Sequence, residues 1–430
     1  MKRIVSLLLA FAAVPALATW VPTADSTTSA PKFTDGNFVI SWNTGNRRFQ
    51  YVSHDSTVST VCDMETFCTD CTAAGYTYPT RAATYAFSGK AGITRVVLPE
   101  ECESLYFNAF ASMPDLESVV LPSRLRWVED VGNHRQIFSA SPKIATVTPR
   151  GVAETNGVAY FPVTVTKLPP NTFQNMKGTA LKHVIAPWAA PAGDAVFQNC
   201  YGLETVTVKD LPAIYTLLFN GCSSLTNIVV LDRATPFAGV SSFVGQQQFQ
   251  GLSSWTQPLD FSASTFTSLG VQTFDCKRVS EYRLPATLTS LTKQAFRCDS
   301  YALSVPRRIW FYGPPPTFYW QSGDPDYIFW APATPRQVVF VPEQYAVAWT
   351  NALSNHGTWT AIADADRARA DYPTKLEDVM VKIRGPKYDL VPTKVKDSDV
   401  LGLSTEGCVG RPYYVVQWRE ATPGTVLLIK

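Results

Sequence analysis

The segment FASMPDLESVVLP, residues 110–122, contains the pattern that decides the fold. After Phe110 comes a small or sulfur-containing residue three positions on, here Met113, and an aliphatic residue three positions further, Leu116. Two more apolar residues follow at the ninth and eleventh positions, Val119 and Leu121, before a proline. A single occurrence would mean little, so its significance rests on repetition.

The same register recurs along the middle of the chain. The phenylalanines that begin each unit are separated by 22 to 35 residues and are Phe87, Phe110, Phe138, Phe173, Phe197, Phe219, Phe249, Phe274 and Phe296. The units at Phe274 and Phe296 are one residue shorter in their first step, and those around Phe138, Phe173 and Phe249 have irregular lengths. Nine matches in one register indicate an internal repeat, with bulging loops or broken coils at the irregular units.

Each unit predicts one short β-strand. Side chains alternate between the two faces of a strand, so the residues nine and eleven positions after each Phe lie on one face. The following proline or loop ends the strand, because proline cannot donate to a β-ladder. Four buried side chains cannot offset the entropy of ordering a whole unit, so the units must stack and share one parallel sheet.

These units resemble the BspA-type leucine-rich repeat. The resemblance is carried best by LTKQAFRCDS, residues 291–300, and LFNGCSSLTNIVV, residues 218–230, and it covers about residues 85–310. It implies a β-rich leucine-rich-repeat solenoid of short parallel strands stacked coil on coil. It also implies, more loosely, a surface adhesin that binds matrix proteins or other cells.

The remaining segments divide the chain. Residues 1–18 have a basic start, an apolar core of ten residues (4–13) and Ala-Leu-Ala, as in a secretory signal peptide. We assign 19–80 to an N-terminal β cap with a hairpin at 38–53, and 81–336 to the solenoid. Residues 337–363 read as a terminal strand and short helix, and 364–430 as a linker and a C-terminal hairpin formed by 412–418 and 425–429.

Composition limits the partners. Lys and Arg total 37 and Asp and Glu 35, so loss of Lys2 and Arg3 with the leader leaves a formally neutral protein. This balance argues against nucleic acid, which requires a basic field. No later segment is apolar enough to span a membrane, so we expect a secreted or cell-surface protein.

The cysteines at the third or second position after Phe allow two interpretations. In the first, Cys200, Cys222, Cys276 and Cys298 are small buried apolar residues. In the second, they form ladder disulfides, Cys200 with Cys222 and Cys276 with Cys298. In the cluster CDMETFCTDC, residues 62–71, a structural disulfide involving Cys68 and Cys71 is favoured over zinc, because no fourth ligand stands at a characteristic spacing.

The predicted binding surface is the outward face of the strands. It consists of the residues eight and ten positions after each Phe, or their equivalents in the shortened unit: Arg95, Val97, Ser118, Val120, Thr205, Thr207, Asn227, Val229, Glu281 and Arg283. Their mixed chemistry suits a protein or a surface glycan, since repeat folds commonly bind partners over such faces.

The chain contains no catalytic signature, cofactor motif or metal-binding motif that we recognise, and its four histidines are scattered. We therefore expect a non-catalytic binding protein without a cofactor. Two alternatives stay open. The solenoid can be a scaffold for a carbohydrate-active or other enzymatic region within 311–430, or the protein can be structural, with Cys408 linking copies in the envelope.

Overall fold

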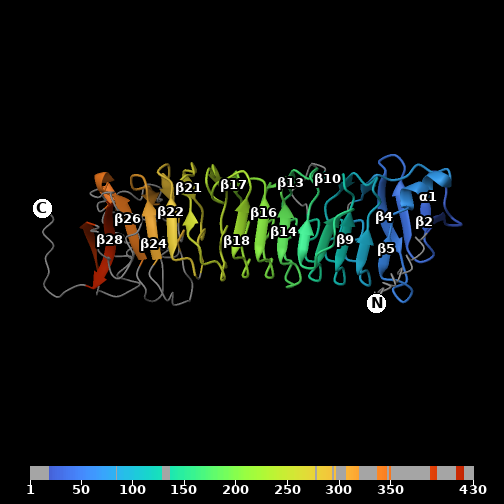
Figure 1. The fold of residues 1–430 in the computed structure, drawn as a ribbon, viewed down its shortest axis with the longest axis horizontal. Coiled ribbons are helices and arrows are strands. Elements are labelled where there is room, and N and C mark those ends of the chain that lie inside the picture. The colour runs from blue at the N-terminus through green and yellow to red at the C-terminus, as the bar shows by residue number, and fades with distance from the viewer. Residues whose placement is uncertain are drawn as a thin grey trace, which may run out of the picture.

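The computed structural model shows an elongated solenoid (Figure 1). It describes residues 19–83, 85–127, 136–276, 278–292, 295–296, 307–318, 337–345, 348–349, 388–394 and 413–420. Cys298, Cys408, the predicted leader and most of 346–387 lie outside these ranges. In the described ranges, no helix is long and apolar enough to cross a bilayer.

The N-terminal region is a small antiparallel meander that merges with the solenoid. Strands β1 (Val21–Pro22), β2 (Lys32–Thr34), β3 (Val39–Asn43) and β4 (Arg48–Ser53) pair in order. The predicted hairpin is confirmed, because β3 and β4 pair antiparallel around a turn in which Arg47 takes a φ of 54°. Helix α1 (Phe67–Ala73) buries Phe67, Cys68 and Cys71 against this region.

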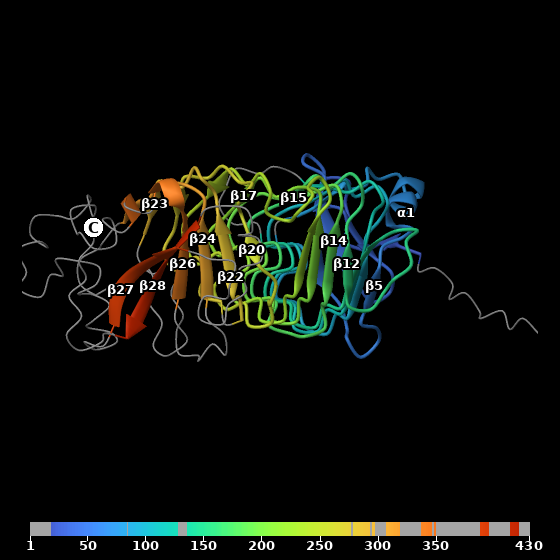
Figure 2. The same ribbon diagram turned by 60° about the vertical axis from the view of Figure 1, so that its left-hand side comes forward.

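One long parallel sheet forms the main wall of the solenoid. Its eight strands are β5 (Val61–Asp63), β7 (Arg95–Val97), β9 (Ser118–Leu121), β11 (Thr146–Pro149), β12 (Val158–Tyr160), β14 (His183–Ala186), β16 (Thr205–Val208) and β18 (Asn227–Val230). The first of these lies inside the segment that the sequence assigned to the cap, and it pairs in parallel with β7. The side-by-side strands are visible in Figures 1 and 2.

Shorter strands form the opposite wall. Strands β6 (Arg81–Ala82), β8 (Ser104–Leu105) and β10 (Arg126–Trp127) continue the sheet of the N-terminal meander. Further along, three small sheets contain β13 (Lys167–Leu168), β15 (Ala190–Pro191), β17 (Ala213–Ile214), β19 (Ser242–Phe243), β21 (Ser268–Leu269), β23 (Ser290–Leu291) and β25 (Thr317–Phe318). Most coils therefore have one strand on the main wall and one on the opposite wall.

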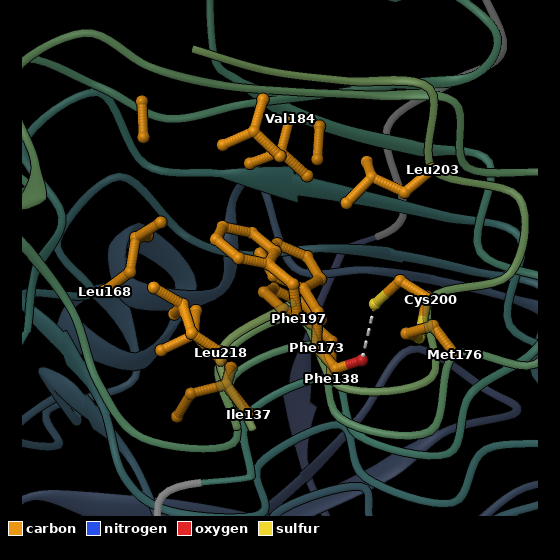
Figure 3. Close-up of a cluster of buried hydrophobic side chains, with 14 of the residues drawn as sticks. Ile137, Phe138, Leu168, Phe173, Met176, Val184, Phe197, Cys200, Leu203 and Leu218 are labelled. Carbon is orange, nitrogen blue, oxygen red and sulfur yellow. Dashed lines mark hydrogen bonds between the residues drawn. The ribbon is translucent and has the colours of Figure 1, made fainter. Parts of the chain in front are cut away.

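The nine phenylalanines form one interior column, as the repeat predicted. All nine are 0% exposed, and consecutive rings lie 5.3 to 5.9 Å apart between centroids, most of them nearly parallel. Figure 3 shows Phe138, Phe173 and Phe197 stacked between Val184 and Leu203 on one side and Leu168 and Leu218 on the other. The residues predicted to point inward from the strands, such as Val119, Val206 and Ile228, are at most 1% exposed.

The backbone repeats as regularly as the side chains. The amide of each column Phe donates to the carbonyl of the residue before the next column Phe, as from Phe197 to Leu218 O at 3.1 Å and from Phe219 to Gln248 O at 2.9 Å. Two positions before Phe, and again two positions after it, the chain adopts a positive φ, as at Ala195 and Asn199. These left-handed residues bend the chain sharply on either side of the column.

The irregular units have structural causes. The 35 residues from Phe138 to Phe173 contain two main-wall strands, β11 and β12, so this unit makes an extra turn that lacks its own column Phe. Phe161 packs beside the column instead, 5.9 Å from the ring of Phe173. Near Phe249, the long sheet ends at β18 and a new sheet begins at β20 (Leu259–Asp260).

The second sheet closes the C-terminal end. After β20 come β22 (Glu281–Leu284), β24 (Arg307–Phe311) and β26 (Gln337–Pro342), all parallel, and 3-10 helix η1 (Glu343–Tyr345) follows β26. Strand β28 (Tyr413–Glu420) then pairs antiparallel with β26 on one edge and β27 (Tyr388–Lys394) on the other. Residues 425–429, which we expected to pair with 412–418, lie outside the described ranges; within those ranges β28 pairs with β26 and β27.

Candidate binding surface

Two rows of side chains cross the outer face of the long sheet. The inward residues fix the register, so the residues on either side of them point outward. The first row runs from Arg95 through Ser118, Thr146, Val158, His183 and Thr205 to Asn227. The second runs from Val97 through Val120, Thr148, Tyr160, Ile185 and Thr207 to Val229. These rows contain eight of the ten residues predicted as the binding face.

The N-terminal half of this face is covered by the chain itself. Residues 150–157, which connect β11 to β12, fold back over the strands: Arg95 donates to both carboxylate oxygens of Glu154 at 2.6 Å. Val97 is 6% exposed and Val120 is 9% exposed. We expected both side chains on the surface, and the structure corrects this, because the inserted loop folds over strands that lie far before it in the sequence.

Arg150 fixes the start of this loop. Its guanidinium pairs with Glu65 and, at 3.4 Å, with Glu100, and it donates to Leu98 O at 2.7 Å. Hydrogen bonding to Arg95 holds the pKa of the Glu154 carboxyl below its ordinary value, although partial burial acts the other way. This loop is thus held over the strands by ion pairs between segments 50 to 85 residues apart.

The C-terminal half of the face is open. Tyr160, Ile185 and Thr207 are half-buried, and Val229 is 36% exposed. In the first row, a hydrogen bond of 2.8 Å joins His183 Nδ1 and Thr205 Oγ1 across neighbouring strands. Thr205, Thr207, Asn227 and Val229 therefore lie on the surface as predicted, on a nearly neutral face of mixed apolar and hydroxyl groups.

Apolar side chains in the turns after the strands enlarge this open half. Val163 is 58% exposed, Trp188 50% and Leu231 51%, and they follow β12, β14 and β18. We call the set of six residues formed by these three with Tyr160, Ile185 and Val229 the open apolar patch. Grouped exposed apolar residues of this kind mark interaction surfaces more often than single ones do. Trp188, Val163 and Leu231 escaped the sequence analysis because they lie outside the strands.

The last two predicted face residues form a closed ion network on the second sheet. Glu281 is 6% exposed, and its carboxylate binds Arg283 at 2.7 Å and Arg308 at 2.9 Å. Partial burial lowers the pKa of Arg283, but the hydrogen bond to Glu281 and the nearby charges outweigh it and raise the pKa. Our placement of Glu281 on the surface is wrong, because the two arginines cover a carboxylate that needs them as partners.

Neither a Cys200–Cys222 disulfide nor one involving Cys68 and Cys71 is formed. The thiols of Cys200, Cys222, Cys68 and Cys71 are free and buried. Each repeat thiol donates instead to the carbonyl of the preceding column Phe, Cys200 to Phe173 O at 3.1 Å and Cys222 to Phe197 O at 2.9 Å. The first of these bonds is drawn in Figure 3.

Other residues at this position behave in the same way. Ser141 donates to Phe110 O at 2.8 Å and Cys276 to Phe249 O at 3.2 Å, so the position favours a small donor. Burial raises the pKa of the Cys222 thiol to about 12. These observations support the first interpretation, small buried residues, for Cys200, Cys222 and Cys276. The pairing of Cys276 with Cys298 involves a residue outside the described ranges.

The CDMETFCTDC cluster is buried in the N-terminal region. The thiol of Cys68 donates to Pro79 O at 3.6 Å, and Cys71 lies three residues further along α1. Burial raises the pKa of both thiols well above the ordinary value. Among the residues that the structure describes, no three His, Cys, Asp or Glu side chains gather in a way that could hold a metal.

The stacked coils, the parallel main wall and the column of phenylalanines together define a leucine-rich-repeat solenoid. The family described as the BspA type leucine rich repeat region matches in six copies over residues 79–150, 158–244 and 192–305, about half of the chain. The chain belongs to this family. The interval between the first two matches, 151–157, coincides with the inserted loop that covers Val97 and Val120.

Comparisons with solved structures give leucine-rich repeat proteins of bacteria. A leucine-rich repeat protein of T. pallidum is 18% identical with a TM-score of 0.35, covering 51% of this chain and 88% of the other. A leucine-rich cell surface protein of Faecalibacterium prausnitzii is 14% identical with a TM-score of 0.37, covering 65% and 88%. A leucine-rich repeat protein of Bacteroides ovatus is 14% identical with a TM-score of 0.27, covering 64% and 93%. None of the curated proteins compared with the chain matches it.

Proposed function

We propose that this protein is an exported, non-catalytic recognition protein that binds a protein partner at the cell surface through the open apolar patch. The leader-like residues 1–18 support export. The observation that carries the binding role is the contrast between the two halves of the strand face. An inserted loop covers one half, whereas Trp188, Val163 and Leu231 remain at least half exposed on the other.

The chemistry of the patch favours a protein as the partner. The centre of a protein interface is depleted in charge and enriched in aromatic residues, and its rim is polar. Tyr160, Ile185 and Trp188 supply the uncharged, partly aromatic centre. His183 and Thr205 supply polar groups for the rim. Two aromatic side chains on adjacent coils are the kind of anchor that dominates binding energy in such interfaces.

The test is capture of surface and matrix proteins by the purified full chain, compared with two patch variants. Trp188→Ala removes the most prominent anchor, and Ile185→Asp places a charge in the centre of the patch. We expect each to weaken capture about tenfold or more, the effect of losing an interface anchor. Val58→Asp, at a valine 69% exposed on the N-terminal region, is the matched control. Equal capture by the patch variants and the control would contradict the proposal.

A further inference from the structure

A row of arginines crosses the outer face of the N-terminal sheet. The register pairs Arg48 of β4 with Arg81 of β6, Arg81 with Ser104 of β8, and Ser104 with Arg126 of β10. The next residues, Phe49, Ala82 and Leu105, are at most 2% exposed and point into the core, so alternation directs the arginine row outward. Four strands at about 4.8 Å spacing give the row a length of about 14 Å.

These guanidinium groups differ from six other cations of the solenoid, which are paired. Arg95, Lys143, Arg150, Lys182, Arg233 and Arg283 each bind a carboxylate within 4 Å. Within the described ranges, neither Arg81 nor Arg126 has a hydrogen bond or ion pair from its side chain, and Arg48 stacks on the ring of Tyr106 at 3.7 Å. Exposed Glu103 precedes Ser104 without pairing with either arginine.

Unsatisfied polar groups lie in the same row. Arg48 Nε and Ser104 Oγ are buried atoms that have no hydrogen-bond partner among the described residues, and Ser104 is 1% exposed. Buried donors without partners are uncommon, because each costs the free energy of its lost hydration. These two atoms are too buried to contact a ligand, so the unpaired guanidinium groups of Arg81 and Arg126 are the groups suited to anionic oxygens, which arginine binds in a bidentate manner.

A cavity of about 520 Å³ opens at the Arg48 end of the row. Its polar lining comes from Ser29, Lys32, Ser41, Asn43, Asn46, Arg48 and Gln50. Lys32 is paired with Asp25, so Arg48 supplies the unpaired charge. The cavity lies within the usual size range of small-molecule sites. Its wall also contains Ala30, Pro31, Trp42 and Ala83, and hydroxyl and amide groups outnumber charged groups among its polar side chains.

We propose that this cavity and the arginine row form a binding site for an acidic polysaccharide, with the cavity holding one sugar unit and the arginines holding its sulfate or carboxylate groups. The hydroxyl and amide lining matches a hydroxyl-rich ligand. An acidic protein segment would need an apolar anchor as well, and the aromatic rings here are covered, with Trp42 and Tyr106 each 4% exposed. The site lies on the other wall from the open apolar patch and is independent of it.

The test is calorimetric titration of the full chain with heparin and with polygalacturonate. Dextran, poly-glutamate and single-stranded oligothymidylate of matched length serve as comparison ligands. We expect binding of an acidic polysaccharide that is tighter than binding of poly-glutamate or the oligonucleotide, with no binding of dextran. Raising the salt concentration should weaken the interaction. Poly-glutamate or the oligonucleotide binding as tightly as the polysaccharide would overturn the assignment, as would an absence of binding.

Variants locate the site. Arg81→Gln with Arg126→Gln removes two guanidinium groups that hold no partner in the described structure, so folding should be preserved, and we expect affinity to fall about tenfold or more. Lys177→Gln, at an exposed lysine on another part of the solenoid, is the control and should change affinity by less than about twofold. Gln50→Ala tests the cavity separately. Unchanged affinity in the double variant would overturn the proposal, and neither result depends on the open apolar patch.

Discussion

Replacing Phe197 tests whether the ring column holds the coils together. Phe197 is 0% exposed and stacks on Phe173 at 5.9 Å and on Phe219 at 5.6 Å between ring centroids. Phe197→Ala removes the buried ring and leaves a cavity that the neighbouring coils cannot fill, which costs about 3–5 kcal/mol. Phe197→Leu keeps most of the volume and loses two ring contacts worth about 0.5–1.5 kcal/mol each, so we expect about 1–3 kcal/mol.

The measurement is urea unfolding followed by tryptophan fluorescence and by hydrogen exchange of the amides near Phe197. Exchange resolves the affected coils even when a repeat array unfolds in several steps. Phe107→Ala is the control, because Phe107 is half-buried and contacts Tyr85 outside the column. A loss below about 1 kcal/mol for Phe197→Ala would refute the idea that column burial stabilises the stack.

Three further predictions concern the loops and the thiols. Arg95 lowers the folded-state pKa of Glu154, so the pair contributes stability at pH values above the unfolded-state pKa. This stability is lost as the pH falls through the folded-state pKa. Hydrogen exchange of residues 150–157 should therefore accelerate below about pH 4, and Glu154→Gln should abolish this dependence. Buried Cys222, with a pKa raised to about 12, should resist iodoacetamide at pH 8 in the native protein and react after unfolding; mass spectrometry showing native labelling would contradict this. Gly221→Ala, whose Cβ would meet Asn199 Oδ1 at 2.4 Å with a φ of 74°, should destabilise more than Gly151→Ala, which has a φ of 81° and open space around it; thermal unfolding showing equal losses would contradict this.

The column and the strands were predictable because both are local. The distance from Phe197 to Val206 and Val208 is fixed within one unit, and burial requires the same residue type each time the chain returns. The same pattern of buried residues therefore recurs nine times in the sequence. Asn199 and similar residues flanking the column are less regular in type, so their left-handed conformation went unrecognised.

The errors arose where distant segments meet. Val97 and Val120 were predicted on the surface from their positions in the strands, but Arg150 and Glu154 bring a later loop over them. Strand β12 was missed because its turn has no Phe in register. The ladder disulfide was considered from the spacing of the coils, whereas the thiol of Cys222 is oriented by the Phe197 carbonyl. For Val97 and Val120 the deciding contacts join residues that no sequence period relates.

The backbone hydrogen bonds that join each column Phe to the next coil also determine how the molecule responds to mechanical force. Hydrogen bonds such as Phe173 N–H to Val196 O run along the long axis of the molecule and join only adjacent coils. Tension applied between the chain ends therefore loads these bonds one coil after another, starting from an end, instead of shearing many at once. Each released coil of 22 to 35 residues would add about 70–120 Å of extended chain. Such a protein would yield in steps when pulled and would limit the load that reaches whatever it holds.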